Sequence, residues 1–285
     1  MLILTGTDGF IGKNVLQKFS KECSEEILTV DFNAQVDPFQ FLENLSHDVY
    51  GDWITTIIHN GACSDTTCND PLYIMKHNFD YCVSLFKECK RKNIRLIYAS
   101  SAAVYGDGPF VENTIKKPKN LYALSKSMFD DYCFAFENNC VGLRYFNVYG
   151  PHEDQKGDMS SVVYKFFAQL NKGKIKLFED SDKYFRDFIH VDDVCDIIYK
   201  IYQDRSVTGI YNLGTGQERT FKEIADIFVK RYDVDVEYIP MPSKLVGKYQ
   251  AYTKADTTKI KKTINHDFLT LEEGVTRYLN FLENA

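Results

Sequence analysis

The sequence lacks two features that would point to a membrane or nucleic-acid protein. It contains no uninterrupted apolar run of 18 residues, so we expect no segment to span a bilayer. It has no basic excess either: 34 Lys and Arg stand against 40 Asp and Glu, a net charge of −6. This balance gives no electrostatic basis for binding nucleic acid or an anionic membrane. The first residues, MLILTGTDGF, carry no basic leader, and we expect no signal peptide.

Metal-binding and disulfide patterns are also missing, although cysteine itself is not scarce. None of the eight cysteines forms a Cys-x-x-Cys pair; they are Cys23, Cys63, Cys68, Cys82, Cys89, Cys133, Cys140 and Cys195. Several lie within apolar helix or strand patterns, where a thiol behaves as a small apolar side chain. We therefore expect no structural disulfide, no bound metal and a reducing, cytoplasmic setting.

The first half of the sequence alternates short apolar runs with helical patterns. The runs are almost continuously apolar, as buried strands of a parallel sheet are, and they span 2–5, 26–31, 54–60, 94–100 and 140–146. Helical patterns lie between them, at 10–22, 38–48, 70–92 and 121–137. This alternation predicts an α/β fold with a Rossmann-type, doubly wound parallel sheet.

The rhythm changes after Gly150-Pro151. The second half predicts helices and extended segments in a looser order, with helices over 159–172 and 191–204 and extended segments over 175–178, 185–191 and 209–216. We therefore predict a dinucleotide-binding domain over 1–150. A smaller, mainly substrate-binding lobe, interleaved with the first, is predicted over 151–285.

Three glycines, Gly6, Gly9 and Gly12, lie between the first predicted strand and helix, in the stretch TGTDGFIG. Glycines at such a turn let the backbone approach a pyrophosphate, which the helix N-terminus attracts. The alternative is an ordinary strand-to-helix turn. However, Asp31 ends the second predicted strand, where a carboxylate accepts hydrogen bonds from a ribose diol. The sequence therefore predicts a dinucleotide site.

Charges near this turn bear on the choice of cofactor. Asp8 would oppose the phosphates if it faced them, so we expect it to turn outward and cap the helix. No Lys or Arg occurs between Lys21 and Lys76, so a 2′-phosphate would lack a nearby cation, and Asp31 would repel it. These residues favour NAD over NADP.

A tyrosine and a lysine stand four residues apart in the predicted helix LYALSKSMFDDY (121–132). This spacing places Tyr122 and Lys126 on one helix face. The pair alone is weak evidence, because a surface tyrosine beside a surface lysine is common. It follows YASSAAVYG (98–106), however, whose Ser100 and Ser101 end the fourth predicted strand, at the sheet edge where ligands bind.

The serine, tyrosine and lysine together resemble the working set of the short-chain dehydrogenase/reductase superfamily. There, the lysine and the positively charged nicotinamide bring the high pKa of the tyrosine toward working pH. The resemblance implies that Tyr122 takes a proton from a sugar hydroxyl and that Ser101 hydrogen-bonds the same oxygen. It also implies that Lys126 anchors the cofactor ribose.

The stretch RYFNVYGP (144–151) is characteristic of the extended branch of this superfamily, which acts on nucleotide sugars. Ala102-Ala103 stand where 4,6-dehydratases of that branch carry Asp-Glu. Two alanines cannot perform acid–base chemistry, which disfavours a dehydratase.

Within this branch the chain resembles the ADP-L-glycero-D-manno-heptose 6-epimerases over almost its whole length. The shared stretches are NGACSDTT (60–67), YASSAAVYG, RYFNVYGP, KGDMSSV (156–162), KLFEDSDKYFRDFIHV (176–191), YNLGTG (211–216) and YIPMPSKLVGKYQAYTKAD (238–256). The resemblance implies transient oxidation at C6″ of ADP-D-glycero-D-manno-heptose and hydride return to the opposite face, with a tightly bound nicotinamide cofactor. It also implies a homo-oligomer formed through the helices at 70–92 and 121–137.

The resemblance assigns further roles residue by residue. Lys156 would be a second catalytic acid/base, although its sequence context alone reads as a solvated loop lysine. The cofactor would contact Gly6, Gly9, Phe10, Ile11, Gly12, Asp31, Asn60, Gly61, Ala62, Cys63, Ser64, Asn78, Tyr122, Lys126 and Val148. The substrate would contact Ser101, Asn147, Asp158, Lys165, Phe178, Glu179, Asp180, Ser181, Arg186 and Tyr249, with Arg186 suited to a diphosphate.

Three features depart from the family. Asp158 replaces a serine, Lys165 replaces a substrate-contacting histidine, and the stretch after Asp31 is shorter and lacks the lysines that the family uses for NADP. Two alternatives therefore remain: another enzyme of the branch, such as a hexose 4-epimerase or a reductase, and a non-catalytic nucleotide-binding scaffold. The presence of both Tyr122 and Lys126 argues against the scaffold.

Some polar residues are expected to be structural. His59 and His190 lie in strand-like stretches, where a satisfied core histidine is more common than a metal ligand. The acid pair Asp192-Asp193 precedes an apolar helical pattern and is expected to cap that helix.

Overall fold

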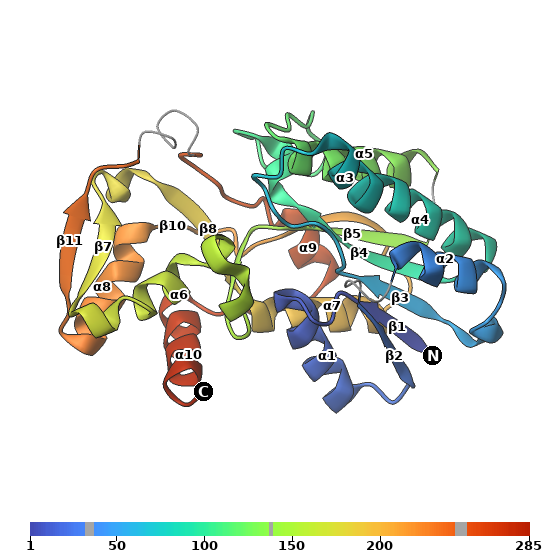
Figure 1. The fold of residues 1–285 in the computed structure, drawn as a ribbon, viewed down its shortest axis with the longest axis horizontal. Coiled ribbons are helices and arrows are strands. Elements are labelled where there is room, and N and C mark those ends of the chain that lie inside the picture. The colour runs from blue at the N-terminus through green and yellow to red at the C-terminus, as the bar shows by residue number, and fades with distance from the viewer. Residues whose placement is uncertain (32–36, 137–138, 243–249) are drawn as a thin grey trace.

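A computed structural model describes residues 1–31, 37–136, 139–242 and 250–285. Its larger part is a six-stranded parallel sheet with the strand order β2-β1-β3-β4-β5-β9 (Figure 1). The strands are β1 (Leu2–Thr5), β2 (Ile27–Val30), β3 (Thr56–His59), β4 (Arg95–Ser101), β5 (Cys140–Tyr145) and β9 (Gly209–Leu213). This confirms the predicted α/β, Rossmann-type sheet.

Helices cover both faces of this sheet. Successive strand residues point to opposite faces, so an almost continuously apolar strand presents apolar side chains on both. Leu2 and Leu4 pack in the core beneath α1 (Phe10–Glu22), α7 (Val191–Gln203) and α9 (Thr258–Thr263). Ile3 packs in the core on the other face. That face is covered by α2 (Pro38–Ser46), α4 (Tyr81–Arg91) and α5 (Leu121–Ala135). The continuous apolar runs of the sequence thus follow from burial on both sides.

The predicted helix at 70–92 is real but not uniform. It consists of α3 (Pro71–Met75), a π-helical turn (Lys76–Asp80) and α4. The π-turn carries the buried Asn78. Short 3₁₀ segments lie elsewhere in the chain, at Gly51–Trp53, Ala102–Tyr105, Asp154–Met159, Leu170–Lys172 and Ser181–Lys183.

A smaller lobe lies beside the sheet (left in Figure 1). A parallel strand pair and three helices enclose its own apolar core: β7 (Lys174–Phe178), β11 (Asp235–Ile239), α6 (Val162–Phe167), α8 (Phe221–Tyr232) and α10 (Leu271–Glu283). A three-stranded sheet adjoins it, with β10 (Glu218–Thr220), β8 (Phe185–His190) and β6 (Asn147–Tyr149) in that order. The predicted helix at 159–172 was too long, because Ser161 caps α6 and 3₁₀ turns flank it.

The chain interleaves the two parts. After β8 it returns to the large sheet as α7 and β9, and it returns again as α9 before ending in α10. Ile198 of α7 and Leu213 of β9 belong to the same core as Leu4 of β1. The large sheet is therefore completed by residues from the second half of the chain.

The cap of α7 differs from the prediction. His190, not the acid pair, is the N-cap, and its Nδ1 accepts a hydrogen bond from the Asp192 amide at 3.1 Å. Asp193 is buried and bonds His266 Nε2 at 2.8 Å. His59 is structural, since its Nδ1 lies 2.7 Å from the Thr5 hydroxyl.

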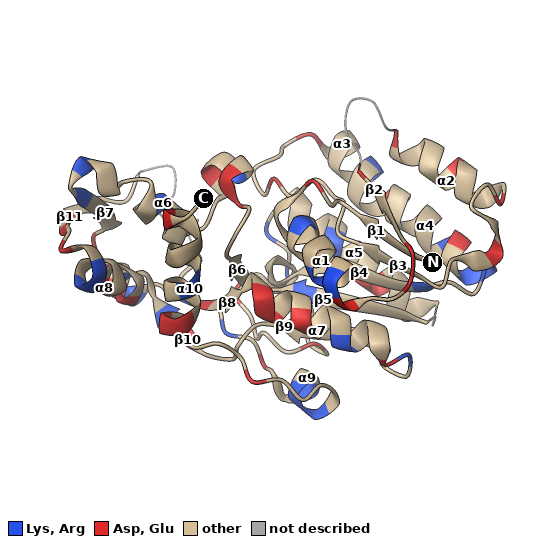
Figure 2. Cartoon of the chain, turned by 90° about the horizontal axis from the view of Figure 1, so that it is seen from below, with Lys and Arg blue, Asp and Glu red and all other residues tan. Residues whose placement is uncertain are grey.

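Acidic and basic residues are interspersed along both lobes (Figure 2). Within the described ranges, no helix combines the length and apolar character that a bilayer crossing requires. The described residues also contain no group of three or more His, Cys, Asp or Glu side chains that could hold a metal ion. All eight cysteines are free.

Candidate active site

Two adjoining cavities lie at the carboxyl edge of the large sheet. One of about 770 Å³ runs along the glycine turn, and one of about 810 Å³ runs between the sheet and the smaller lobe. The residues that line both are Ser64, Ser101, Tyr122, Phe146, Val148, Lys156 and Met159. We call the first the dinucleotide cavity and the second the substrate cavity. Three of the four predicted catalytic residues thus stand where they meet.

The glycine turn packs too closely for side chains. A Cβ at Gly12 would lie 1.9 Å from the Gly6 carbonyl oxygen, and one at Gly6 would lie 2.6 Å from the Gly61 amide nitrogen. Gly9 is the N-cap of α1, and no described side chain caps this helix. The unpaired amides of its first turn therefore stay available to an anion at the wall of the dinucleotide cavity, which Phe10 and Ile11 also line.

Asp31 lies at the far end of the glycine turn. Its carboxylate accepts hydrogen bonds from the Thr7 hydroxyl and, at 2.8 Å, from the Asp8 amide. The Asp8 side chain is exposed, as predicted, but it does not cap α1. Asp31 also lines the dinucleotide cavity. The turn and the acid are thus one hydrogen-bonded unit, and Thr7 is a member that the sequence did not single out.

The loop after β3 forms another wall of the dinucleotide cavity, through Asn60, Gly61, Ala62 and Ser64. The Asn78 amide fixes this loop, accepting from the Cys63 amide and donating to the Cys63 carbonyl, both at 2.9 Å. It also donates to Ser125 on α5 at 3.2 Å. Asn78 is fully buried and lines neither cavity, so it positions the loop against α5.

The predicted tyrosine, lysine and serine come together. Asn120 caps α5, so Tyr122 lies in its first turn and Lys126 one turn later. The buried Lys126 donates to the Ala99 carbonyl of β4 at 2.9 Å, and its Nζ lies 6.0 Å from the Tyr122 ring centroid. Ser101, at the end of β4, accepts a hydrogen bond from the Ala103 amide at 3.2 Å. A phenol, an ammonium and a hydroxyl thus meet at the end of one strand.

Lys156 reaches the same region from the 3₁₀ segment that precedes α6. Its Nζ lies 4.6 Å from the Phe10 ring centroid and 3.7 Å from Glu153 Oε2. Burial lowers the pKa of Lys156, and the Glu153 carboxylate opposes that shift. Lys156 is therefore not the solvated loop lysine that its sequence context suggests.

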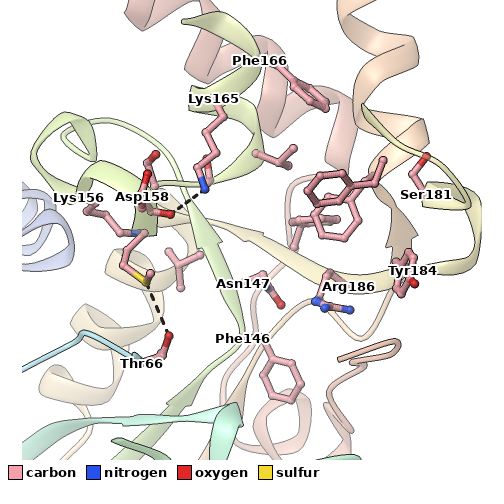
Figure 3. A pocket seen from close by; sticks show the side chains of 18 of the residues that line it. Thr66, Phe146, Asn147, Lys156, Asp158, Lys165, Phe166, Ser181, Tyr184 and Arg186 are labelled. Atoms are coloured by element: carbon pink, nitrogen blue, oxygen red, sulfur yellow. Dashed lines mark hydrogen bonds between the residues drawn. The ribbon is translucent and has the colours of Figure 1, made fainter. Parts of the chain in front are cut away.

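The substrate cavity extends from Tyr122 into the smaller lobe. Figure 3 shows side chains that line it, among them Asn147, Lys165 and Arg186. Predicted substrate residues that line it are Ser101, Asn147, Asp158, Lys165, Phe178, Ser181 and Arg186. The buried Arg186 guanidinium donates to the Phe185 and Gln250 carbonyls. Lys165 donates to the Asp158 carbonyl at 2.7 Å. Glu179 and Asp180 are exposed and do not line the cavity, and Tyr249 lies outside the described residues.

The comparisons with known proteins agree with this geometry. Residues 2–214 match the model of the NAD dependent epimerase/dehydratase family. The chain belongs to this family. It is also 39% identical to an ADP-L-glycero-D-manno-heptose-6-epimerase from Brachyspira hyodysenteriae, over 100% of this chain and 98% of the relative.

Solved structures show the same fold. A Helicobacter pylori ADP-L-glycero-D-manno-heptose-6-epimerase is similar with a TM-score of 0.88 and 28% identity, covering 100% of this chain and 96% of that one. A UDP-N-acetylglucosamine 4-epimerase from Methanobrevibacter ruminantium is similar with a TM-score of 0.86 and 23% identity, covering 100% and 98%. The predicted epimerase resemblance and nicotinamide dependence are confirmed.

A buried polar network supports the site of this epimerase-family chain. Arg144 of β5 and Asp130 of α5 form an ion pair at 2.8 Å with both side chains almost fully buried. Arg144 also donates to the Tyr105 hydroxyl at 2.7 Å, and Tyr105 donates to Asn212 at 2.6 Å. The network ties α5 to the segment after Ser101 and to β9. No local pattern in the sequence predicts this network.

Proposed function

We propose that this enzyme interconverts ADP-D-glycero-D-manno-heptose and ADP-L-glycero-D-manno-heptose by inverting C6″. The observation that carries the proposal is the position of Tyr122 and Ser101, which line both the dinucleotide and the substrate cavity. The heptose substrate is supported by the full-length similarity to the Brachyspira hyodysenteriae epimerase.

The first half of the reaction removes a proton and a hydride from the C6″ carbinol. Tyr122, held as a phenolate by the nearby Lys126 ammonium, takes the hydroxyl proton and becomes a neutral phenol. The Ser101 hydroxyl donates to the substrate oxygen and stabilises its changing charge. When bound, the nicotinamide dinucleotide accepts the hydride from the substrate carbon and later returns it.

The second half needs a proton donor for a ketone that has turned in the site. Lys156 fills this role, because it lines both cavities and is a cation on a different wall from Tyr122. Its pKa is lowered by burial, so it exchanges a proton more readily at working pH than an exposed lysine. In this scheme Tyr122 and Lys156 serve opposite faces of the inverted carbon.

The cofactor is proposed to be NAD rather than NADP. Asp31 lines the dinucleotide cavity and would repel a 2′-phosphate. Among the described residues that line this cavity, the only Lys or Arg side chains are Lys126 and Lys156, which belong to the catalytic end. Residues 32–36, which follow Asp31, lie outside the described residues.

The smaller lobe is proposed to hold the nucleotide diphosphate of the substrate. It contributes Arg186, Lys165 and Lys176 to the cavity wall, and cationic side chains suit a diphosphate. Asp158 and Lys165 replace the serine and histidine of the family, so contacts to the sugar would differ in detail. The domain limits 1–150 and 151–285 remain a proposal.

A homo-oligomer and a cytoplasmic location are further parts of the proposal. Leu72 and Tyr73 of α3 and Leu124 of the adjoining α5 are exposed apolar side chains. Pairing two copies over these helices would bury them. Eight free cysteines suit a reducing compartment.

The test is direct. Purified protein with NAD is incubated in D₂O with ADP-D-glycero-D-manno-heptose, and proton NMR follows both C6″ epimers. The expected result is a mixture of epimers without deuterium at C6″, because the hydride never exchanges with solvent. Parallel incubations with UDP-glucose and UDP-N-acetylglucosamine test the 4-epimerase alternative. Epimerisation of a UDP-hexose alone, or deuterium at C6″, would contradict the proposal.

A further inference from the structure

A buried carboxylate that the reaction does not use lies next to the proposed second acid/base. Glu153 is 0% exposed, although it lies in the polar stretch HEDQKGD. A carboxylate is almost never fully buried without partners that stabilise it. The partners of Glu153 therefore show what its burial accomplishes.

Two of these partners belong to one residue. The Ser161 amide donates to Glu153 Oε2 at 2.6 Å, and the Ser161 hydroxyl donates to Oε1 at 2.5 Å. Ser161 is the N-cap of α6 and accepts from the Tyr164 amide. Glu153 thus closes a loop over residues 153–161, and Lys156 lies inside that loop.

The third partner is Lys156 itself. Its Nζ lies 3.7 Å from Glu153 Oε2, and its side chain is 29% exposed. The ring face of Phe10, on α1, lies against the same ammonium. The loop, the carboxylate and the aromatic ring together restrict where the ammonium can be.

We infer that Glu153 is a positioning residue for Lys156, anchoring its loop and holding its ammonium with a buried opposite charge. The importance of Lys156 to the reaction rests on the proposed function; the coupling between Glu153 and Lys156 does not.

Other charged and titratable groups surround this pair. Lys165 of α6 is a second cation that lowers the pKa of Lys156. Tyr278 of α10 faces the Glu153 carboxylate, and burial, followed by that carboxylate, raises its pKa, so the phenol stays neutral. Asp154 lies near Tyr278 and is exposed. Within the described residues, Glu153 is thus the anion in direct ion-pair contact with Lys156.

The variant Glu153→Gln removes the negative charge of residue 153 but can keep its two hydrogen bonds with Ser161. The amide oxygen can still accept from the Ser161 amide, and the amide nitrogen can donate to the Ser161 hydroxyl oxygen instead of accepting from it. The shape and both contacts are kept, while the negative charge is lost. Asp154→Asn is the matched control, because it removes an acid from the same turn that forms no ion pair with Lys156.

The readout is the pH dependence of Lys156 acetylation by acetic anhydride in the resting protein, followed by mass spectrometry of the peptide that contains it. Removing a carboxylate beside an ammonium favours the neutral amine, so the midpoint should fall by about one pH unit or more in Glu153→Gln. Asp154→Asn should leave it within a few tenths of a unit. An unchanged midpoint in Glu153→Gln would overturn the inference.

A folding failure would also be decisive. If Glu153→Gln does not fold, Glu153→Asp is tested in its place. This variant keeps the negative charge but moves it away from Lys156 by one methylene group. The midpoint of Lys156 acetylation must then lie below that of the unmodified protein. If neither variant folds, Glu153 is a structural anchor only and the inference is wrong. The labelling needs no substrate, so a shifted midpoint in a protein that does not epimerise the heptose would refute the proposed function alone.

Discussion

The ammonium of Lys126 donates a 2.9 Å hydrogen bond to the carbonyl oxygen of Ala99. This bond joins the helix that carries Tyr122 to the strand that ends in Ser101. The lysine is therefore held in place before any ligand arrives. Its positive charge is thus pre-organised next to the Tyr122 phenol.

Replacing Tyr122 with phenylalanine should abolish most of the epimerisation. Loss of a general acid/base costs about 10²–10⁴ in kcat. Binding of the cofactor and the ADP-sugar should remain, measured by calorimetry. Tyr132→Phe, on the same helix but away from both cavities, is the control and should keep full activity. Full activity in Tyr122→Phe would remove its assigned role.

Substitutions at two glycines of the turn should have different effects. Gly12→Ala places a Cβ 1.9 Å from the Gly6 carbonyl oxygen, so the backbone must shift. We expect about 1–3 kcal/mol of destabilisation, measured by urea unfolding, together with loss of NAD binding. In Gly9→Ala the nearest atom, the Gly6 carbonyl oxygen, lies 3.3 Å from the added Cβ, so this variant should lose less stability than Gly12→Ala while still binding NAD more weakly. Equal stability losses in the two variants would contradict this account.

Asp31→Ser should change the preference between NAD and NADP. The carboxylate faces the dinucleotide cavity and would be replaced by a neutral hydroxyl. We expect the Kd for NAD to rise about tenfold, which corresponds to about 1.4 kcal/mol. NADP should bind at least as tightly as before. Titration calorimetry measures both. Asp52→Ser, which removes an exposed acid that lines neither cavity, should leave the ratio unchanged; a shift of the same size there would mean that net charge alone decides.

Breaking the Arg144–Asp130 pair should destabilise the fold strongly. Both side chains are almost fully buried, so Asp130→Ala leaves an uncompensated guanidinium. Removal of one partner of a buried pair costs about 3–5 kcal/mol. Lys222→Ala removes an exposed pair with Asp226 at 2.8 Å and should cost no more than about 0.5 kcal/mol. A small loss in Asp130→Ala, measured by urea unfolding, would show that the buried network is dispensable.

The core elements could be predicted because their signals are local. β1 and α1 occur where continuous apolar residues and a helical pattern predicted them, since burial on both faces of a parallel sheet leaves a strong trace in the sequence. To predict that Tyr122 and Lys126 lie side by side, only the helical repeat was needed. Placement of Ser101 beside them needed only the rule that strand ends share one edge.

Other features depend on contacts that no local pattern records. Glu153 lies among polar residues and is buried only because α6 and α10 pack around it. The pairing of Arg144 with Asp130 joins a strand and a helix whose contact arises from the folded sheet. His190 replaced the expected acid pair as a helix cap because its ring, not a carboxylate, points at the free amide. Such partners require the tertiary structure.

The free energy of unfolding should decrease as the pH is lowered, because of His59. Burial, followed by the Lys126 charge, lowers the pKa of His59 from 6.5 to about 3. Between these values the unfolded chain binds one proton more than the folded protein, so acidification favours unfolding. Between pH 6.5 and pH 5 this amounts to about 2 kcal/mol. Urea unfolding at both pH values should show a smaller loss in His59→Gln; an identical loss would mean that His59 already carries a proton when folded.

The interleaved path of the chain limits how the protein can be divided. A cut near Gly150 would put β9 and α7 on one fragment, and would put β5, which pairs with β9, and α1, which packs against α7, on the other. The first fragment would expose the backbone of β5 as a bare edge, which invites aggregation. A gene split there would yield two insoluble pieces, whereas insertions into an exposed surface loop would leave both lobes intact.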